Sequence, residues 1–149
     1  MPRTILFVCT GNTCRSPMAE GIARQLIGQG ILGPPDSWAV GSAGTNTGDG
    51  HPATPEAVHA MRELQIDISN HRSRMLTREI LEWGSIIYAM TQRHVDAINA
   101  LAPTARDRLY LLDPNGEIED PFGADQATYD RTARHLVRTV RDRLQEVTA

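Results

Sequence analysis

The stretch Cys9-Thr10-Gly11-Asn12-Thr13-Cys14-Arg15-Ser16 decides the fold of this chain, because it joins an apolar strand to the start of a helix. The preceding run Thr4-Ile5-Leu6-Phe7-Val8 is β-prone and too short for a helix. Pro17, a residue favoured in the first turn of a helix, is followed at helical spacing by Met18, Ile22 and Leu26. The loop therefore lies between the carboxyl end of a strand and the N-terminus of a helix.

A loop in that position is suited to bind an anion. Unpaired backbone N–H groups and the positive end of the helix dipole attract negative charge, and Arg15 adds a planar fork of donors for phosphate oxygens. The same field favours the thiolate form of Cys9, toward which Ser16 can donate a hydrogen bond. Gly11 and Asn12 can adopt positive φ angles. We predict that Cys9 is a nucleophile and that Arg15 is its oxyanion clamp.

The alternative is that these residues have no chemical role. A cysteine at the end of a buried strand usually only packs, and a surface arginine is usually solvated. Five residues separate Cys9 from Arg15 in one turn-forming loop, and this combination favours the catalytic interpretation. The loop is not a nucleotide-binding Walker loop, because that motif requires a lysine and all fifteen basic residues of this chain are arginines.

The composition is typical of a single globular domain. With 149 residues and 40% apolar content, the chain can bury one core and is too short for two ordinary domains, so we expect one domain over residues 1–149. The net charge of -3 argues against a nucleic-acid partner. The apolar run near the N-terminus is too short for a signal peptide or a membrane span. We expect a cytoplasmic monomer with no membrane partner.

Only two cysteines occur, Cys9 and Cys14, and both lie in the loop. Two cysteines in one loop make neither a disulfide framework nor a four-ligand metal site, so we expect no metal and no other cofactor. From the residues alone, Cys14 is equally consistent with a small packing residue and with a redox partner of Cys9.

Strand-like and helix-like patterns alternate along the chain. Apolar spacing predicts strands over residues 4–8, 38–42, 85–90 and 108–112, and helices from residue 17 onward and over residues 55–64 and 93–101. The last helix is the most clearly amphipathic, with apolar residues three and four apart: Tyr129, Ala133, Leu136, Val137, Val140, Leu144 and Val147. This alternation predicts an α/β, doubly wound fold with a parallel sheet, which binds ligands at the carboxyl ends of its strands.

Two Asp-Pro pairs are candidates for the proton donor that phosphoryl transfer to Cys9 requires. Asp113-Pro114-Asn115-Gly116 has turn chemistry throughout and is most simply a β-turn. Asp120-Pro121-Phe122-Gly123 follows the fourth predicted strand and precedes the last helix, where it can overhang the same edge of the sheet. Its position makes Asp120 the favoured candidate of the two.

The segment from Val8 to Glu20, with Cys9, Arg15 and Ser16, resembles the signature of the low-molecular-weight protein tyrosine phosphatase family, and is most similar to its bacterial branch that acts on phosphoarginine. The resemblance continues through Ser42-Ala43-Gly44-Thr45, His71-Arg72-Ser73-Arg74, Ala89-Met90-Thr91 and Asp120-Pro121-Phe122-Gly123. One position departs from the pattern, since the family's tyrosine phosphatases usually carry aspartate where this chain has Thr91.

The resemblance implies a three-layer, flavodoxin-like fold with four parallel strands in the order 2-1-3-4. It also implies that Asp120 is the general acid, and that Asn12, Ser42 and His71 hold the loop in shape. Cys14 would trap the oxidised nucleophile as a reversible disulfide. The implied phosphate and substrate contacts are Thr10, Gly11, Asn12, Thr13, Cys14, Ser16 and Phe122.

Two features bear on the substrate. Thr13 stands where the tyrosine phosphatases usually have isoleucine, and Phe122 is the one aromatic residue of the wall that follows Asp120. A hydroxyl and a thin aromatic wall suit a phosphorylated guanidinium better than a phenol. The alternative is that threonine and isoleucine are similar in volume and the difference is neutral.

We therefore expect a cysteine-dependent protein phosphatase that hydrolyses phosphoarginine in proteins through a phosphocysteine intermediate. A phosphotyrosine phosphatase is the nearest alternative. Arsenate reductase is less favoured, because its relay needs a cysteine pair further along the chain and none follows Cys14. A non-catalytic phosphate-binding module is disfavoured because Cys9, Arg15 and Asp120 are all present.

Overall fold

Four parallel strands form the central sheet, in the order β2-β1-β3-β4. They are β1 (Arg3–Cys9), β2 (Trp38–Gly44), β3 (Ile86–Ala89) and β4 (Leu109–Leu111). In the computed structural model, which describes residues 3–147, Phe7 of β1 lies opposite Ser42 on one side and Tyr88 on the other. The sheet order and the parallel strands confirm the predicted fold class.

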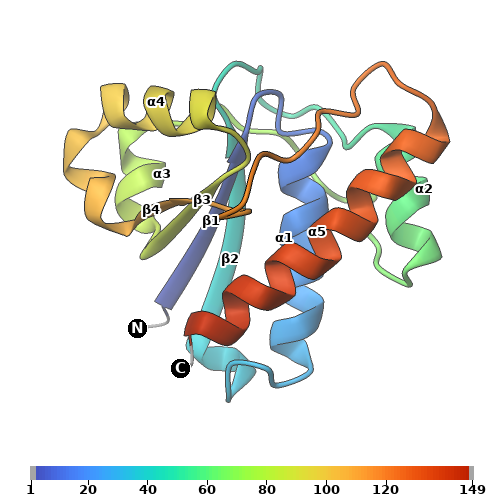
Figure 1. The fold of residues 1–149 in the computed structure, drawn as a ribbon, viewed down its shortest axis with the longest axis horizontal. Helices are drawn as coiled ribbons and strands as arrows, with labels where there is room; N and C mark the ends of the chain where they lie inside the picture. Colours follow the sequence, from blue (N-terminus) through green and yellow to red (C-terminus); the bar gives the residue numbers. More distant parts are fainter. Residues whose placement is uncertain (1–2, 148–149) are drawn as a thin grey trace.

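Helices cover both faces of the sheet (Figure 1). On one face lie α1 (Arg15–Gly28), α2 (Pro55–Glu63) and α5 (Gln126–Val147), and on the other α3 (Arg78–Trp83) and α4 (Gln92–Leu101). Short 3₁₀ turns, Pro35–Ser37 and Pro103–Arg108, precede β2 and β4. The predicted elements are confirmed with boundaries shifted by one or two residues. The six-residue helix α3 was not predicted, because it is too short to show a period.

Both faces of β1 are buried, as expected of a central parallel strand. Ile5 and Phe7 join the core under α1 and α5, whereas Leu6 and Val8 join the core under α3 and α4. Cys9, the last residue of β1, continues the first of these two sets. The alternation of side chains along the strand therefore directs Cys9 toward the α1 side of the sheet.

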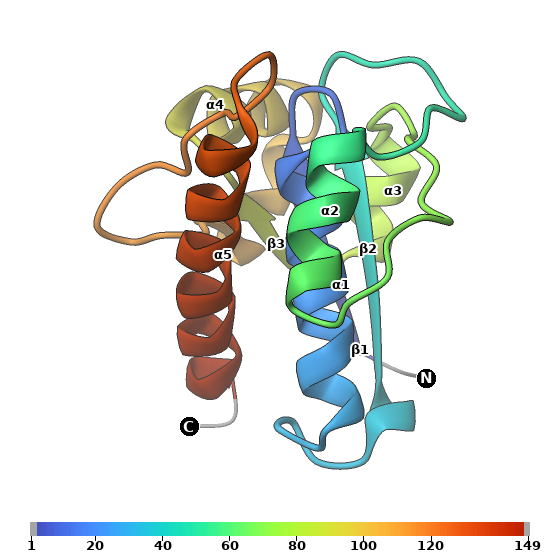
Figure 2. The same cartoon turned by 90° about the vertical axis from the view of Figure 1, so that its right-hand side faces the viewer.

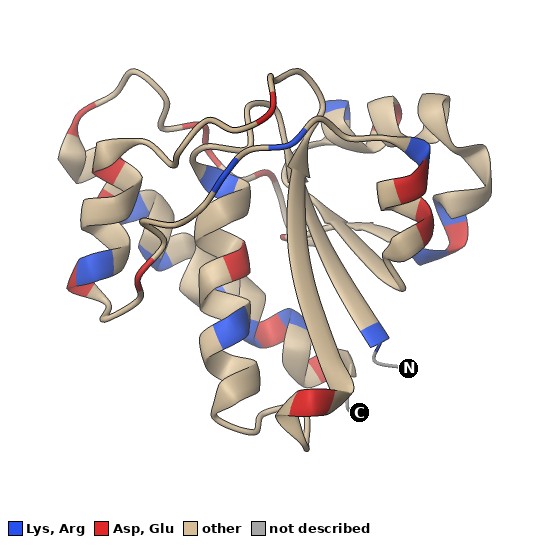
Figure 3. Ribbon diagram, turned by 180° about the vertical axis from the view of Figure 1, so that it is seen from behind, with Lys and Arg blue, Asp and Glu red and all other residues tan. Residues whose placement is uncertain are grey.

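The amphipathic pattern of α5 is confirmed. Its core-facing residues are buried beside α1 and α2, and Figure 2 shows the three helices side by side: Tyr129, Ala133, Leu136, Val140 and Leu144 are buried, while Val137 and Val147 are partly buried at the edge of the core. Acidic and basic residues are interspersed on the helices seen from behind (Figure 3). Between residues 3 and 147, no helix has the length and apolar content needed to cross a bilayer.

The loops that follow the strands gather at one edge of the sheet, at the top of Figure 1. The loops after β1, β2 and β4 comprise residues 10–14, 45–54 and 112–125. The first of these loops contains the predicted nucleophile, and the third contains the predicted acid.

Candidate active site

The loop after β1 is tightly wound around Asn12. Asn12 has a φ angle of 54°, in the left-handed region, and its side chain is fully buried. Of the two residues predicted to adopt positive φ, only Asn12 does so. A buried asparagine in this region is strained unless its neighbours hold it, and such strain is common at ligand-binding loops.

Cys9 lies at the floor of this loop, with two hydrogen-bond donors close to its sulfur. The hydroxyl of Ser16 is 2.9 Å from Sγ, and the backbone N–H of Asn12 donates to Sγ at 3.3 Å. Because Ser16 Oγ already accepts from Asn12 Nδ2 at 2.8 Å, its own proton is available to the sulfur. Both donors stabilise negative charge on Cys9.

Arg15, the first residue of α1, is buried beside the loop. Its side chain is 4% exposed, and its Nη1 donates to the backbone oxygen of Ile118 at 3.1 Å. Its Nη2 lies 3.5 Å from Oδ2 of Asp120, whose side chain is 52% exposed. The tertiary structure therefore places the predicted acid beside the predicted clamp.

Asp113 occupies a different position. Its backbone oxygen accepts from Gly116 N–H at 3.2 Å, and its Oδ1 accepts from Asn115 N–H at 2.9 Å, which is the predicted β-turn. Its Oδ2 lies 2.7 Å from Nε2 of His135 on α5. Asp113 therefore takes part in a turn and an ion pair, and Asp120 alone of the two contacts Arg15.

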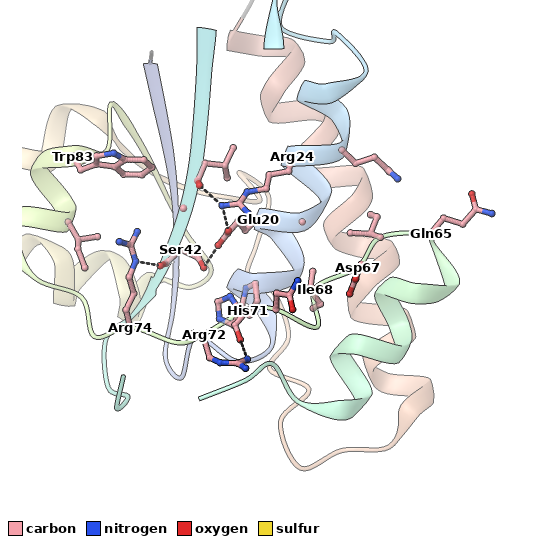
Figure 4. Close-up of a pocket in the computed structure, with 18 of the residues that line it drawn as sticks. Glu20, Arg24, Ser42, Gln65, Asp67, Ile68, His71, Arg72, Arg74 and Trp83 are labelled. Atoms are coloured by element: carbon pink, nitrogen blue, oxygen red, sulfur yellow. Dashed lines mark hydrogen bonds and ion pairs between the residues drawn. The ribbon is translucent and has the colours of Figure 1, made fainter. Parts of the chain in front are cut away.

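Three groups from two segments, β2 and residues 71–74, hold Asn12 on the β2 side of the loop. Its Nδ2 donates to Ser42 Oγ at 2.9 Å, its Oδ1 accepts from the backbone N–H of Arg74 at 2.9 Å, and its backbone oxygen accepts from His71 Nε2 at 2.6 Å. Burial lowers the pKa of His71, which favours the neutral ring. Ser42 in turn donates to Glu20 of α1, as Figure 4 shows. Glu20 and the Arg74 backbone were not among the predicted supporting groups.

Cys14 precedes α1 and is also buried. Its sulfur lies 3.3 Å from the hydroxyl of Tyr129 and 3.7 Å from Oγ1 of Thr54, and burial raises the pKa of its thiol. Cys14 also belongs to the apolar core under α1. The packing role is thus present in the structure, and the redox role stays a prediction.

The two residues that bear on substrate choice differ in exposure. Phe122 is 69% exposed on the loop that carries Asp120, and its backbone N–H donates to Asp120 Oδ1 at 3.1 Å. Thr13 is half-buried, and its backbone oxygen accepts from Thr54 N–H at 2.9 Å. An aromatic ring exposed to that extent beside the acid is available for contact with a substrate.

His94 was missed in the sequence. It lies in the first turn of α4 and is 2% exposed, with its Nε2 2.8 Å from Oγ1 of Thr10 in the loop. A single histidine in an amphipathic helix gives no local signal of such a contact.

Comparison with known proteins agrees with this geometry. Residues 4–149 match the family described as low molecular weight phosphotyrosine protein phosphatase. A protein-arginine-phosphatase from Geobacillus stearothermophilus is 38% identical over 98% of this chain and 96% of its own length. An arsenate reductase from Staphylococcus xylosus is 37% identical over 87% of this chain and 86% of its own length.

Solved structures give the same result. The crystal structure of a YwlE mutant from Bacillus subtilis superposes with a TM-score of 0.91 at 33% identity, covering 99% of both chains. A YwlE arginine phosphatase variant with a phosphorylated active-site serine superposes with a TM-score of 0.88 at 33% identity, covering 97% of this chain and 95% of that chain. The resemblance seen in the sequence is confirmed: this chain belongs to the low-molecular-weight phosphotyrosine protein phosphatase family.

Proposed function

We propose that this protein is a protein-arginine phosphatase that works through a phosphocysteine intermediate. One observation carries the proposal: the Cys9 sulfur, with donors from Ser16 and Asn12, lies in a loop whose Arg15 is 3.5 Å from the Asp120 carboxylate. A nucleophile, an anion clamp and a carboxylic acid are the groups that cysteine-dependent phosphoryl transfer requires.

In the first step, the Cys9 thiolate attacks phosphorus and the bond from phosphorus to the substrate nitrogen breaks. Arg15 and the loop N–H groups stabilise the charge on the phosphoryl oxygens, and Asp120 gives its proton to the departing nitrogen. In the second step, Asp120 as carboxylate takes a proton from water, and the hydroxide attacks phosphorus and releases the Cys9 thiolate. In the related variant, serine replaces a cysteine and this active-site serine is phosphorylated, which supports a covalent intermediate on cysteine.

Phosphoarginine is proposed as the substrate on two grounds. Thr13 presents a hydroxyl where an isoleucine would give an apolar wall for a phenyl ring, and a relative of 38% identity is named a protein-arginine-phosphatase. The proposed substrates are phosphorylated proteins, and the proposed enzyme is a cytoplasmic monomer that needs no cofactor.

The experiment is the hydrolysis of phosphoarginine and phosphotyrosine peptides side by side, with a higher kcat/KM expected for phosphoarginine. A higher kcat/KM for phosphotyrosine would overturn the substrate assignment.

Arsenate reduction is the second candidate, because one relative of 37% identity is named an arsenate reductase. The chain has two cysteines in all, Cys9 and Cys14, whereas the reductase relay needs a further pair. We therefore expect no reduction of arsenate in the presence of thioredoxin, thioredoxin reductase and NADPH. Steady NADPH consumption that depends on arsenate would favour the reductase.

A further inference from the structure

The loop between β1 and α1 (residues 10–14), which we call the phosphate loop, is held from two opposite sides. On the β2 side, His71, Ser42 and the backbone of Arg74 bind Asn12. On the β3 side, the ring of His94 lies against Thr10, the residue that follows the nucleophile. The backbone N–H groups of Thr45 and Asn46 donate to the backbone oxygens of Cys9 and Thr10. These bonds do not involve the Thr10 side chain, whose partner is His94.

The sheet order explains why His94 reaches the loop. β3 pairs with β1, so that Ala89 lies opposite Val8 and the two chains leave the sheet next to each other. Thr91 then caps α4 by accepting from the backbone N–H of His94, which turns the first helical residues back over the end of β1. The His94 side chain is therefore directed at Thr10 by the capped first turn of α4.

Both nitrogens of the His94 ring have hydroxyl partners. Nε2 lies 2.8 Å from Thr10 Oγ1, and Nδ1 lies 3.0 Å from Thr91 Oγ1. A neutral imidazole has one donor and one acceptor, and each hydroxyl can take either part. The uncharged ring is thus fully satisfied, and the two bonds fix its orientation.

The surroundings also keep the ring neutral. Burial lowers the pKa of His94 to about 4, and the positive charges of Arg15 on α1 and Arg93 on α4 act in the same direction. Asp120 and Glu117, on the segment between β4 and α5, oppose this effect without overcoming it. At neutral pH, His94 therefore acts through its geometry and adds no charge beside Arg15.

We propose that His94 is a positioning residue of the phosphate loop. Its imidazole fixes the Thr10 side chain and, through it, the backbone next to Cys9, in the conformation that receives the phosphoryl group. This inference rests on the proposed function for its catalytic consequence, but the shape of the anion site can be measured without turnover. The competing role is packing alone, in which His94 only fills space between α4 and the sheet.

The experiment compares His94→Leu, which removes both ring hydrogen bonds, with His94→Gln, which keeps an amide at about the reach of Nε2. For an aryl phosphate, we expect His94→Leu to lower kcat/KM about tenfold and His94→Gln to stay within about threefold of the wild type. Thr10→Val removes the hydroxyl partner at nearly the same volume and should give about the same loss as His94→Leu. The double variant His94→Leu/Thr10→Val should be no worse than His94→Leu, because the bond that Thr10→Val removes is one that His94→Leu has already removed.

His135 offers a matched control. It is also a histidine with a short hydrogen bond, to Asp113 at 2.7 Å, and among residues 3–147 neither partner has a hydrogen bond to residues 9–16. His135→Leu should leave kcat/KM unchanged. Each variant is assayed below the unfolding temperature measured for it, so that loss of folded protein does not count as loss of activity.

Binding of inorganic phosphate, measured by calorimetry, separates this inference from the proposed function. His94→Leu and Thr10→Val should each weaken phosphate binding several-fold even if the wild type proves inactive on phosphoarginine. Packing alone would be shown by equal losses in His94→Gln and His94→Leu, or by a further loss when His94→Leu is added to Thr10→Val. Unchanged phosphate binding in Thr10→Val would also overturn the inference. If His94→Leu does not fold, the results for Thr10→Val and His94→Gln are sufficient to distinguish positioning from packing.

Discussion

The carboxylate of Asp120 lies 3.5 Å from the guanidinium of Arg15, and half of the acid side chain is exposed while the arginine is buried. The proposed acid therefore forms an ion pair with the residue that is proposed to bind the phosphate. Arg15 attracts an approaching phosphate, whereas Asp120 repels it whenever its carboxylate carries no proton. This arrangement gives Asp120 two measurable effects, one on proton transfer and one on anion binding.

Asp120→Asn should lower kcat by roughly a hundredfold or more for a poor leaving group, and much less for nitrophenol, because only the poor leaving group depends on a proton donor. Phosphate should bind about two- to fivefold more tightly to this variant, since a half-exposed negative charge has been removed. Steady-state kinetics with a series of aryl phosphates and calorimetry measure the two effects. Asp113→Asn is the control, and a dependence on leaving group in that variant alone would reverse the assignment.

Cys9→Ser should abolish turnover while phosphate and vanadate still bind, because the serine hydroxyl is a poor nucleophile that leaves the loop donors in place. Arg15→Lys should lower kcat/KM by about 10² to 10³, since an ammonium group cannot make the two parallel contacts of a guanidinium. Kinetics and vanadate titration check both variants. Substantial activity in Cys9→Ser would exclude the phosphocysteine mechanism.

Mild peroxide should inactivate the enzyme reversibly through a disulfide between Cys9 and Cys14. The disulfide requires the two β-carbons to lie within bonding reach, and it would replace the contacts that the Cys14 thiol makes with Tyr129 and Thr54. In Cys14→Ser, inactivation should become harder to reverse with thiols. Mass spectrometry of the peroxide-treated protein detects the disulfide, and equal recovery of both proteins would leave Cys14 a packing residue only.

Thr13→Ile should shift the ratio of kcat/KM values for phosphoarginine and phosphotyrosine toward phosphotyrosine. Loss of a polar partner leaves a desolvated group unpaired, so the shift should be about five- to a hundredfold. The ratio is the informative quantity, because Cys9 and Arg15 contribute equally to both reactions. A ratio within about twofold of the wild type would show that Thr13 does not select the substrate.

The free energy of unfolding should rise with pH between about 4 and 6.5, because burial lowers the pKa of His94 to about 4 and also lowers that of His71. In this range the unfolded chain binds protons that the folded protein does not, and above 6.5 neither state binds them. His94→Gln should remove up to roughly 3 kcal/mol of this dependence. Urea unfolding at pH 4.5 and 7 measures it, and an unchanged slope in His94→Gln would contradict a buried neutral ring.

The sequence predicted the strand-loop-helix structure around Cys9–Ser16 and the long helix α5, because neighbouring residues determine both. Five residues between a cysteine and an arginine, after a strand and before a helix, already predict an anion site. The buried residues of α5 repeat every three or four positions, which a helix alone explains. The strand order came from family resemblance, since periodicity does not say which strands are neighbours.

The contacts that complete the site were decided by tertiary structure. His94 and Thr10 are 84 positions apart, and they meet because β3 lies beside β1. Ser42 and Glu20 meet because β2 packs beside α1. The path of the loop before α5 places Asp120 beside Arg15 and Asp113 beside His135. Local pattern determines which backbone elements form and where their reactive ends lie, whereas partners distant in sequence depend on how those elements pack.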